Sequence, residues 1–412
     1  RTVEEIHAAL RQLNRQHPVL TELITYGQST CLAKRGCTTL GGEILAGHEL
    51  LALRISNETV AGTSTVVNST ITGGEKPVFF LLANIHAREI ATTEIAMRLI
   101  DHLLLNYGQD SDVTAIVDWH EIWIIPTANP DGHWLVELGA HADYDQGAFF
   151  QRKNANLDAN NDGQSDCLFW PPATNWQYGV DLNRNHAYAW GQDGASDDPC
   201  SQTYLGPEPA SENEVYALQS LVQALIPDQR GEGHSDAAPL STSGILLTLH
   251  SFGNLVIWPW GNSTDEAPNY EGLQAIGDKL GQYNGYTSCQ AAKCLYSASG
   301  TTDDWAYGTL GIPAFTIEIG NRFMPDFTEI DQKLWPDNLP SLLYAARIAQ
   351  SPYQTILGPD IYDVKTSVSM QDEMVNIVAT VDDREHGGST IVAASYAIDL
   401  PTWLDNTTVN PM

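Results

Sequence analysis

Two potential metal ligands, His86 and Glu89, lie where an apolar run at 77–85 passes into a segment of helical periodicity at 88–105. An imidazole and a carboxylate three positions apart can share one ion when the first leaves a strand end and the second lies in the first turn of a helix. Capping and dipole effects also place such residues at helix starts, so this pattern alone is a weak indication. His250 closes a further apolar run, at the same expected edge of a sheet. Two imidazoles and one carboxylate with an open fourth position form a catalytic zinc site.

The elements that must position these ligands alternate along the first 350 residues. Apolar runs that predict buried strands lie at 49–55, 77–85, 121–125, 245–249, 255–258 and 314–318. Helical periodicity marks 3–13, 88–105, 212–225, 270–283 and 340–349. The stretch from 129 to 206 is rich in Gly, Pro, Asn, Asp and Trp and predicts long functional loops. We therefore expect one large α/β/α domain at 1–350 with a mixed, mostly buried central sheet.

Residues 351–412 have a different character. Three short strands are expected at 364–368, 374–381 and 390–398, separated by turn clusters and without helical periodicity. Three strands are too few to close a sandwich. We expect a β-rich C-terminal appendage, either the start of an accessory β-sandwich module or a packed extension.

Composition excludes several classes of protein. The chain has 412 residues, of which 42% are hydrophobic, as in a soluble globular protein with an ample core. Its net charge of -31 argues against nucleic acid as a partner, since phosphate binding needs a basic surface. The longest apolar run, 78–85, is far shorter than the roughly 20 residues of a membrane span. We expect a monomer with no membrane span.

The six cysteines form three close pairs in the sequence: Cys31 with Cys37, Cys167 with Cys200, and Cys289 with Cys294. Many connectivities are possible for six cysteines, so pairing between neighbours is one hypothesis among them. None of the pairs has the CxxC spacing of a metal site. Disulfides in an exported protein are favoured over free buried thiols, which predicts a secreted, extracellular protein.

Five motifs together resemble those of the zinc metallocarboxypeptidases of the funnelin type, in the family's order and over residues 1 to about 349. They are HARE at 86–89, NPDG at 129–132, GVDLNRN at 179–185, LHS at 249–251 and FTIE at 315–318. The resemblance implies that His86, Glu89 and His250 bind one Zn²⁺ and that Glu318 is the general base. Zinc lowers the pKa of a bound water towards neutrality, and a carboxylate can take its proton and return it to the leaving amine.

The same resemblance assigns further roles. Arg152 matches the arginine that polarises the scissile carbonyl and stabilises the oxyanion, and Arg88 matches an auxiliary substrate contact. Asp181 would accept a hydrogen bond from a zinc-bound imidazole and fix its tautomer. Without the resemblance, Arg152 would be interpreted as a solvated loop cation.

An exopeptidase must also recognise a terminal carboxylate. Asn183 and Arg184 match the family's carboxylate clamp, in which arginine offers a planar bidentate fork. Tyr296 matches the mobile tyrosine that closes over the substrate end. Peptide and protein C-termini are therefore the expected substrates. A tyrosine beside a loop is often only a packing residue, and that alternative stays open.

Asp303 aligns with the base of the pocket that receives the C-terminal side chain. In the family an aspartate there accompanies Lys or Arg preference, because a buried carboxylate needs a cationic partner. The alternative is helix capping, since Thr-Asp-Asp-Trp at 302–305 is also a good helix N-terminus. We expect basic, or mixed basic and apolar, preference.

Two features depart from the family. Residues 158–166 form an inserted D-x-N-x-D-G loop that resembles the first half of an EF-hand loop. Its candidate Ca²⁺ ligands are Asp158, Asn160, Asp162, Gln164 and Asp166, and an Asx-rich turn is the alternative. His186 stands where relatives usually have an aromatic residue, next to the carboxylate clamp.

Three classes of function remain open on the sequence. The first is a zinc carboxypeptidase that removes single C-terminal residues. The second is a metallohydrolase of the same scaffold that acts on cell-wall peptides or N-acyl amino acids. The third is a catalytically silent binding protein, which the complete set of ligands and base disfavours. The clamp residues favour the first.

Overall fold

The computed structural model describes residues 1–67, 70–140, 147–231, 233–369, 374–405 and 407–412. The chain divides into two compact units, Arg1–Pro352 and Tyr353–Met412. Each unit is described by itself.

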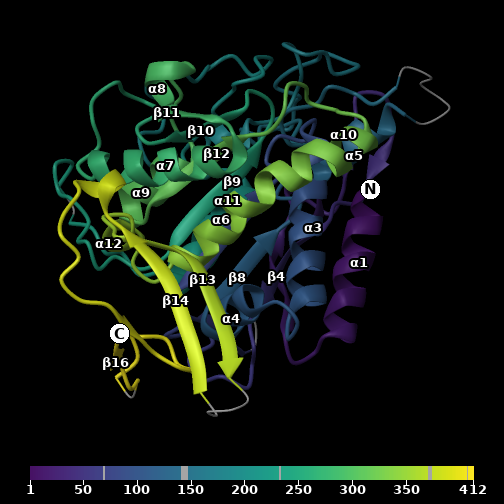
Figure 1. The fold of residues 1–412 in the computed structure, drawn as a ribbon. Helices are drawn as coiled ribbons and strands as arrows, with labels where there is room; N and C mark the ends of the chain where they lie inside the picture. The colour runs from purple at the N-terminus through teal and green to yellow at the C-terminus, as the bar shows by residue number, and fades with distance from the viewer. Residues whose placement is uncertain (68–69, 141–146, 232, 370–373, 406) are drawn as a thin grey trace. The chain divides into compact units, whose positions relative to one another are not determined.

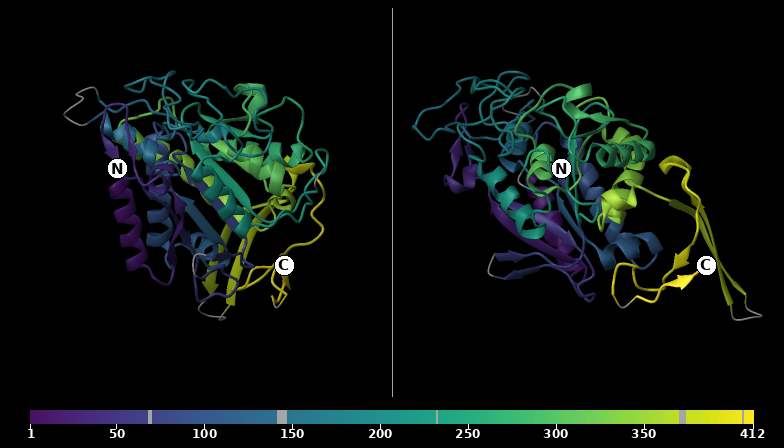
Figure 2. Two further views of the ribbon diagram at one scale, coloured as in Figure 1. Left: turned by 180° about the vertical axis from the view of Figure 1, so that it is seen from behind. Right: turned by 90° about the vertical axis from the view of Figure 1, so that its left-hand side faces the viewer.

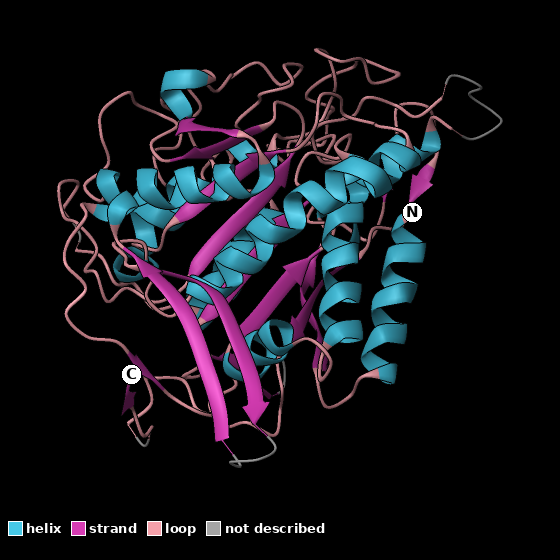
Figure 3. Ribbon diagram, in the orientation of Figure 1, coloured by secondary structure: helices cyan, strands magenta, loops and turns pink. Residues whose placement is uncertain are grey.

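Within the described residues, eight strands of the first unit form one sheet in the order β1-β4-β8-β7-β9-β12-β10-β11 (Figure 3). Their bounds are β1 Thr21–Gln28, β4 Glu49–Ile55, β7 Val78–Ala83, β8 Glu121–Ile125, β9 Ile245–His250, β10 Leu255–Trp258, β11 Thr287–Gln290 and β12 Ala314–Glu318. The central strands β8, β7, β9 and β12 are parallel, whereas β1, β4 and β8 pair antiparallel and β10 runs antiparallel to β12. The mixed sheet confirms the predicted fold class.

Helices cover both faces of this sheet, as the right-hand view of Figure 2 shows. The helix α11 packs against α3, α7 and β7 and crosses in front of the sheet in Figure 1, while α6 contacts β1 and α9 contacts β9 and β12. The helices of this unit are α1 Val3–Gln16, α2 Thr30–Ala33, α3 Ile90–Asn106, α4 Ser111–Trp119, α5 Pro130–Leu138, α6 Asn213–Leu225, α7 Tyr270–Asn284, α8 Ala291–Cys294, α9 Thr302–Leu310, α10 Phe327–Glu329 and α11 Trp335–Ile348. Short helical turns occur at η1 Leu182–Arg184 and η2 Ile330–Leu334, and small hairpins at β2 Cys37–Thr38 with β3 Ile44–Leu45 and at β5 Thr65–Val67 with β6 Thr70–Thr72. No helix in the described part of the chain is long and apolar enough to span a membrane.

The core is the middle of the sheet. Every residue of β7, β8 and β9 is buried, as expected of parallel strands covered on both faces. The parallel strands β7, β9 and β12 end at one edge, with Ala83 opposite Leu249 and His250 opposite Glu318. Three chain segments with polar side chains therefore leave the core side by side.

Two predicted boundaries in this unit were wrong. The segment 129–206 is not all loop, because Asn129 accepts a hydrogen bond from Gly132 N–H and caps α5, with Pro130 in the first turn. The last helix begins at Trp335 rather than at 340. Pro340, taken as a helix start, lies in the second turn of α11, where its missing N–H only deprives the carbonyl of residue 336 of a donor.

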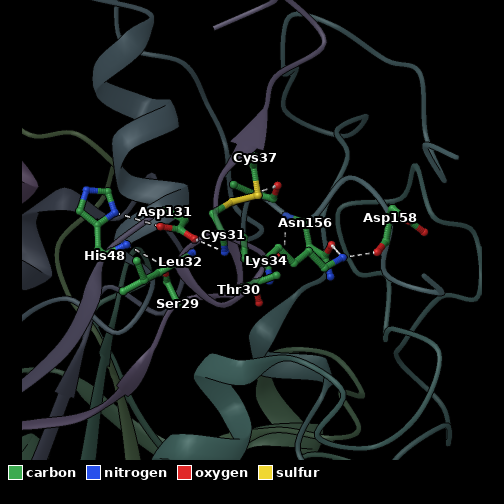
Figure 4. The surroundings of a disulfide bond; sticks show 12 residues. Ser29, Thr30, Cys31, Leu32, Lys34, Cys37, His48, Asp131, Asn156 and Asp158 are labelled. Carbon is green, nitrogen blue, oxygen red and sulfur yellow. Dashed lines mark hydrogen bonds and ion pairs between the residues drawn. A yellow bond between two sulfur atoms is a disulfide. The ribbon is translucent and has the colours of Figure 1, made fainter. Parts of the chain in front are cut away.

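Three disulfides join Cys31 to Cys37, Cys167 to Cys200 and Cys289 to Cys294, which confirms the pairing between sequence neighbours. Figure 4 shows the surroundings of the first. The Cys31 backbone N–H donates to Oδ2 of Asp131 at 2.9 Å, and Oδ1 of Asp131 lies 2.9 Å from Nδ1 of His48. The disulfide-bonded segment is thereby fixed to the first turn of α5.

The second unit is rich in β-structure. Its strands are β13 Asp360–Ser369, β14 Met374–Asp382, β15 Ser395–Tyr396 and β16 Asn410–Pro411, with a turn η3 at Arg384–His386, and the short helix α12 spans Pro352–Thr355. The first two form an antiparallel hairpin, and the last two pair with each other. The strand expected at 390–398 is reduced to Ser395–Tyr396. The accessory β-sandwich stays a prediction.

Candidate metal centre and active site

A tight turn after β7 delivers the first two candidate ligands. Asn84 follows the strand with a φ of 56°, and its Nδ2 donates to the carbonyls of His86 at 3.2 Å and Ala87 at 3.1 Å. Glu89 lies three residues further on, at the N-cap of α3. The side chains of His86 and Glu89 therefore point towards each other, and the side chain of His250 reaches the same place from the end of β9.

The three side chains meet. Nδ1 of His86 lies 2.9 Å from Oε1 of Glu89, and Nδ1 of His250 lies 3.2 Å from Oε2 of Glu89. The two Nδ1 atoms are 3.0 Å apart. All three residues are buried, and among the described residues they are the group whose ligand atoms gather closely enough to hold a metal ion. The predicted ligand set is thus brought together.

The opposite ring nitrogens test whether these residues fit zinc. Nε2 of His86 lies 3.3 Å from Oδ1 of Asp181, and Nε2 of His250 lies 3.1 Å from Oγ1 of Thr248. Nε2 of His86 makes no hydrogen bond among the described residues, although Oδ1 of Asp181 is its near neighbour. A proton on each Nε2 would leave both Nδ1 lone pairs directed at the shared point. Burial lowers the pKa of His86, whereas in His250 the effect of burial is outweighed by Glu89, which raises the pKa of that ring. Metal binding needs the neutral form of both imidazoles. The residues fit a zinc ion.

The ligand carboxylate is ionised. Burial opposes the charge of Glu89, but His86 and His250 outweigh it and lower the pKa of Glu89 below its usual range. On binding zinc, both imidazoles would give up any proton on the ligand nitrogen, and the set with one carboxylate would leave a net positive charge at the ion.

Asp181 connects the metal centre to Arg152. Nε of Arg152 donates to Oδ2 of Asp181 at 2.9 Å, while Oδ1 accepts the N–H of Asn183 at 3.0 Å. Although burial raises the pKa of Asp181, Arg152 and His86 lower it well below its usual range. The ionised carboxylate fixes the Arg152 guanidinium and lies beside the His86 ring. Its predicted hydrogen bond with a zinc-bound imidazole stays a prediction.

Glu318 lies opposite His250 across the β9–β12 ladder. Burial raises the pKa of Glu318 to about 7, with His250 lowering it and Glu89 raising it. A carboxylate with a pKa near neutrality can both take up and release a proton at physiological pH.

A pocket opens over these groups and collects most of the predicted residues. Its polar lining consists of His86, Arg152, Asn183, Arg184, His250, Tyr296, Thr301, Asp303, Thr316 and Glu318, and its apolar lining includes Ile257, Ala291, Leu295 and Ala298.

Arg184 is largely fixed by the protein but keeps one donor free. Its Nε donates to the carbonyl of Gly194 at 2.9 Å and its NH1 to the carbonyl of Asn183 at 2.7 Å. Its NH2 is buried and has no hydrogen-bond partner among the residues that the structure describes. The half-exposed ring of Tyr296 lies 5.9 Å from the guanidinium. A buried cationic donor at a pocket wall can bind an anion.

A model of the zinc carboxypeptidase family matches residues 6–340. The chain belongs to the zinc carboxypeptidase family. Zinc carboxypeptidase A 1 of Anopheles gambiae is 28% identical over 325 residues, which cover 77% of this chain and 59% of that protein. Carboxypeptidase B of Astacus astacus is 28% identical over 254 residues, covering 60% of this chain and 71% of that protein.

The fold of the family is shared as well. Bovine thrombin-activatable fibrinolysis inhibitor, solved in complex with tick carboxypeptidase inhibitor, matches with a TM-score of 0.62 at 21% identity. The match covers 85% of this chain and 97% of that chain. The chain thus has the carboxypeptidase fold, and it spans less than two thirds of the Anopheles relative.

Asp303 was interpreted either as the base of the pocket for the C-terminal side chain or as part of a helix cap. The capping side chain is Thr301, which accepts a hydrogen bond from the N–H of Asp304, and Asp303 lies in the first turn of α9. Asp303 is buried, lines the pocket and accepts a hydrogen bond from Oγ1 of Thr316 at 3.2 Å. Although the cap is made by Thr301, Oδ1 of Asp303 also accepts the N–H of Asp304 at 3.1 Å in the same first turn. The carboxylate therefore both contacts the helix start and lines the pocket.

Arg88 does not line the pocket. Its guanidinium donates to the carbonyl of Thr174 at 3.1 Å and to Oε1 of Gln202 at 3.0 Å, and it lies 4.2 Å from the Phe323 ring centroid. Burial and Arg152 lower the pKa of Arg88 to about 10. Its predicted contact with substrate stays a prediction.

The inserted loop at 158–166 forms Asx-type turns. Asp158 accepts the N–H groups of Asp162 and Gly163 at 3.0 Å each, Asn160 accepts that of Asp162 at 2.9 Å, and Asp162 accepts that of Gln164 at 2.8 Å. Oδ2 of Asp166 accepts the N–H of Ala159. Side-chain oxygens of four of the five candidate ligands therefore accept hydrogen bonds from backbone N–H groups of the loop. Calcium binding stays a prediction.

Two functional positions were missed by sequence reasoning. Asn84 shapes the ligand turn, and Thr248 contacts His250. Each is a single polar residue inside an otherwise apolar strand run, and Thr248 is two positions before His250, on the same face of β9. That interruption of the apolar pattern was the available signal.

Proposed function

We propose that this protein is a zinc-dependent carboxypeptidase that hydrolyses the C-terminal peptide bond of peptides and proteins. The observation that carries the proposal is the unpartnered NH2 of Arg184, buried in the same pocket as the zinc ligands and Glu318. A free α-carboxylate is the anion that an exopeptidase must bind there. Arg184 NH1 lies 4.0 Å from Oδ2 of Asp181, so the open capacity of the guanidinium is the NH2 group. A pocket built for internal peptide bonds would gain nothing from a buried N–H donor without an acceptor.

The side chains divide the work. His86, Glu89 and His250 would hold a zinc ion, which would supply Lewis-acid activation of water and of the scissile carbonyl. Glu318 takes the proton of the attacking water and returns it to the leaving amine. Arg152, kept in place by Asp181, faces the carbonyl oxygen and stabilises its developing negative charge.

The substrate end is bound by the other wall of the pocket. Arg184 and Asn183 donate to the two oxygens of the terminal carboxylate. Tyr296, half exposed and close to Arg184, closes over that end once it is bound. These contacts orient the last peptide bond towards the metal centre.

We propose a preference for basic, or mixed basic and apolar, C-terminal residues. Asp303 is a buried carboxylate at the pocket wall, among apolar side chains such as Ile257 and Leu295. Pairing with Lys or Arg offsets the cost of leaving this carboxylate unpaired. The Anopheles A-type relative and the Astacus B-type relative are both 28% identical to this chain, so the proposed preference rests on Asp303.

We also propose that the protein acts outside the cell. All six cysteines form disulfides, which persist in oxidising compartments.

Zinc-loaded protein of measured metal content should be incubated with N-blocked dipeptides that end in Arg, in Phe and in the C-terminal amide of each. Hydrolysis of both free acids, faster for Arg, and little or none of the amides is expected. An inactive protein with one zinc per chain, or equal cleavage of acids and amides, overturns the carboxypeptidase proposal. A tenfold or greater preference for Phe overturns the specificity alone.

A further inference from the structure

The amide of Asn183 is held in one orientation. Its Oδ1 accepts the backbone N–H of Thr302 at 2.9 Å and lies 3.0 Å from Oγ1 of Thr302. A backbone N–H can only donate, so the atom that it meets must be the amide oxygen. Asn183 also lines the pocket, so its NH2 group is the part left to face a ligand there. An ionised carboxylate can only accept hydrogen bonds, so a carboxylate bound in the pocket needs the NH2 group of Asn183, and not its oxygen, to face it.

A histidine continues this contact away from the pocket. Nε2 of His186 lies 2.9 Å from Oγ1 of Thr302, and Nδ1 of His186 lies 3.1 Å from Nε2 of Gln219 on α6. The Gln219 amide donates to Nδ1, so the neutral ring carries its proton on Nε2. The Thr302 hydroxyl then accepts from His186, and its single hydrogen is directed at Oδ1 of Asn183.

The surroundings keep this chain of hydrogen bonds intact. His186 and Thr302 are fully buried and Gln219 is nearly so, which excludes competing water. Burial lowers the pKa of His186 to about 3, so the ring stays neutral around physiological pH. The backbone N–H of His186 donates to the carbonyl of Gly300 at 3.0 Å, which joins the segment after Asn183 to the segment before Thr302.

We propose that His186, oriented by Gln219, is a positioning residue that directs the Thr302 hydroxyl at Oδ1 of Asn183 and so keeps the Asn183 NH2 group turned towards the terminal carboxylate of the substrate. The inference rests on the proposed function, because it concerns the carboxylate-binding wall of the same pocket. An apolar aromatic ring at position 186 could fill the space but could not donate to Thr302.

A double-mutant cycle tests this arrangement. His186→Phe removes the donor and Thr302→Val removes the hydroxyl, so each should raise KM for an N-blocked dipeptide ending in Arg about fivefold, as the loss of one hydrogen bond does. The double variant should show no further rise, because both changes break one chain. The value of kcat should change less than about twofold, since the carboxylate is bound in both ground and transition states.

Two further variants sharpen the result. His186→Gln keeps an N–H donor near the position of Nε2 and should restore KM, whereas Gln223→Leu, on the exposed side of α6, should leave KM unchanged. If His186→Phe does not fold, Gln219→Leu replaces it in the cycle with the same expectation.

The inference is overturned if His186→Phe leaves KM unchanged, if its effect multiplies with that of Thr302→Val, or if kcat and zinc content fall together with the rise in KM. These outcomes are measured on variants of an active wild-type enzyme. An inactive, zinc-loaded wild type would instead refute the proposed function.

Discussion

The carboxylate of Asp181 accepts a hydrogen bond from Nε of Arg152 at 2.9 Å, while its other oxygen lies 3.3 Å from Nε2 of His86. One buried anion therefore lies between a candidate metal ligand and the cation that we propose faces the substrate carbonyl. We expect such an arrangement to couple metal binding to oxyanion stabilisation, because the loss of the Asp181 charge would weaken both at once.

We predict that Asp181→Asn lowers zinc affinity about 10- to 100-fold and also lowers kcat, since the amide keeps the shape of the carboxylate but not its charge. Zinc affinity is measured by competition with a chelator, and kcat at saturating zinc. The exposed Asp197→Asn is the matched control and should change neither. Unchanged zinc affinity in Asp181→Asn would show that the His86 ring does not depend on this charge.

We predict that Glu318→Gln lowers kcat by about 10²- to 10⁴-fold while zinc remains bound, because the amide cannot take a proton. Metal analysis and initial rates on the same sample separate the two effects. The exposed Glu271→Gln on α7 should keep full activity. An active, zinc-loaded Glu318→Gln protein would refute the assignment of the base.

The positions of those site residues that lie at the ends of strands could be predicted from the sequence. His250 and Glu318 end apolar runs, and parallel strands bring their carboxyl ends to one edge, so their meeting followed from the fold class. The roles of Arg152 and Arg184 were not predictable from residue type, because both lie in the long loop segment, where neither period nor length fixes a position. Only the resemblance to a family assigned them.

Helix existence was easier to predict than helix bounds. The segment 88–105 corresponds to α3, Ile90–Asn106, since a strong apolar stripe defines it. The predicted start of α11 was wrong because proline is common at the start of helices. Pro336 and Pro340 both lie in the first two turns of α11, so either could have marked its start. The hydrogen bonds of Thr302 with His186 and Asn183 join residues about 120 positions apart, which no local pattern reports.

We predict that Asp303→Leu reverses the preference for the C-terminal residue. Removal of the carboxylate leaves an incoming Arg without its buried partner, which should lower kcat/KM for the Arg peptide at least about thirtyfold and raise that for Phe. Thr316, which donates to Asp303, provides the comparison: Thr316→Val should weaken Arg preference less than the loss of the charge itself. Equal loss for both peptides in Asp303→Leu would place Asp303 in folding rather than in selectivity.

The buried ring of His186 predicts an acid-sensitive stability. Burial lowers its pKa to about 3, whereas an unfolded histidine titrates near 6.5, so the unfolded chain binds the proton first. The stability that depends on a neutral His186 is therefore fully present above about pH 7 and is lost as the pH falls through 6.5. At pH 5 the free energy of unfolding should be lower by about 2 kcal/mol for this reason. The free energy of unfolding is measured in urea with a chelator present, which excludes effects of zinc release. Between pH 7 and pH 5 it should fall by about 2 kcal/mol less in His186→Gln than in the wild type. An equal loss in His186→Gln would mean that the folded protein accepts a charged ring at this position without cost.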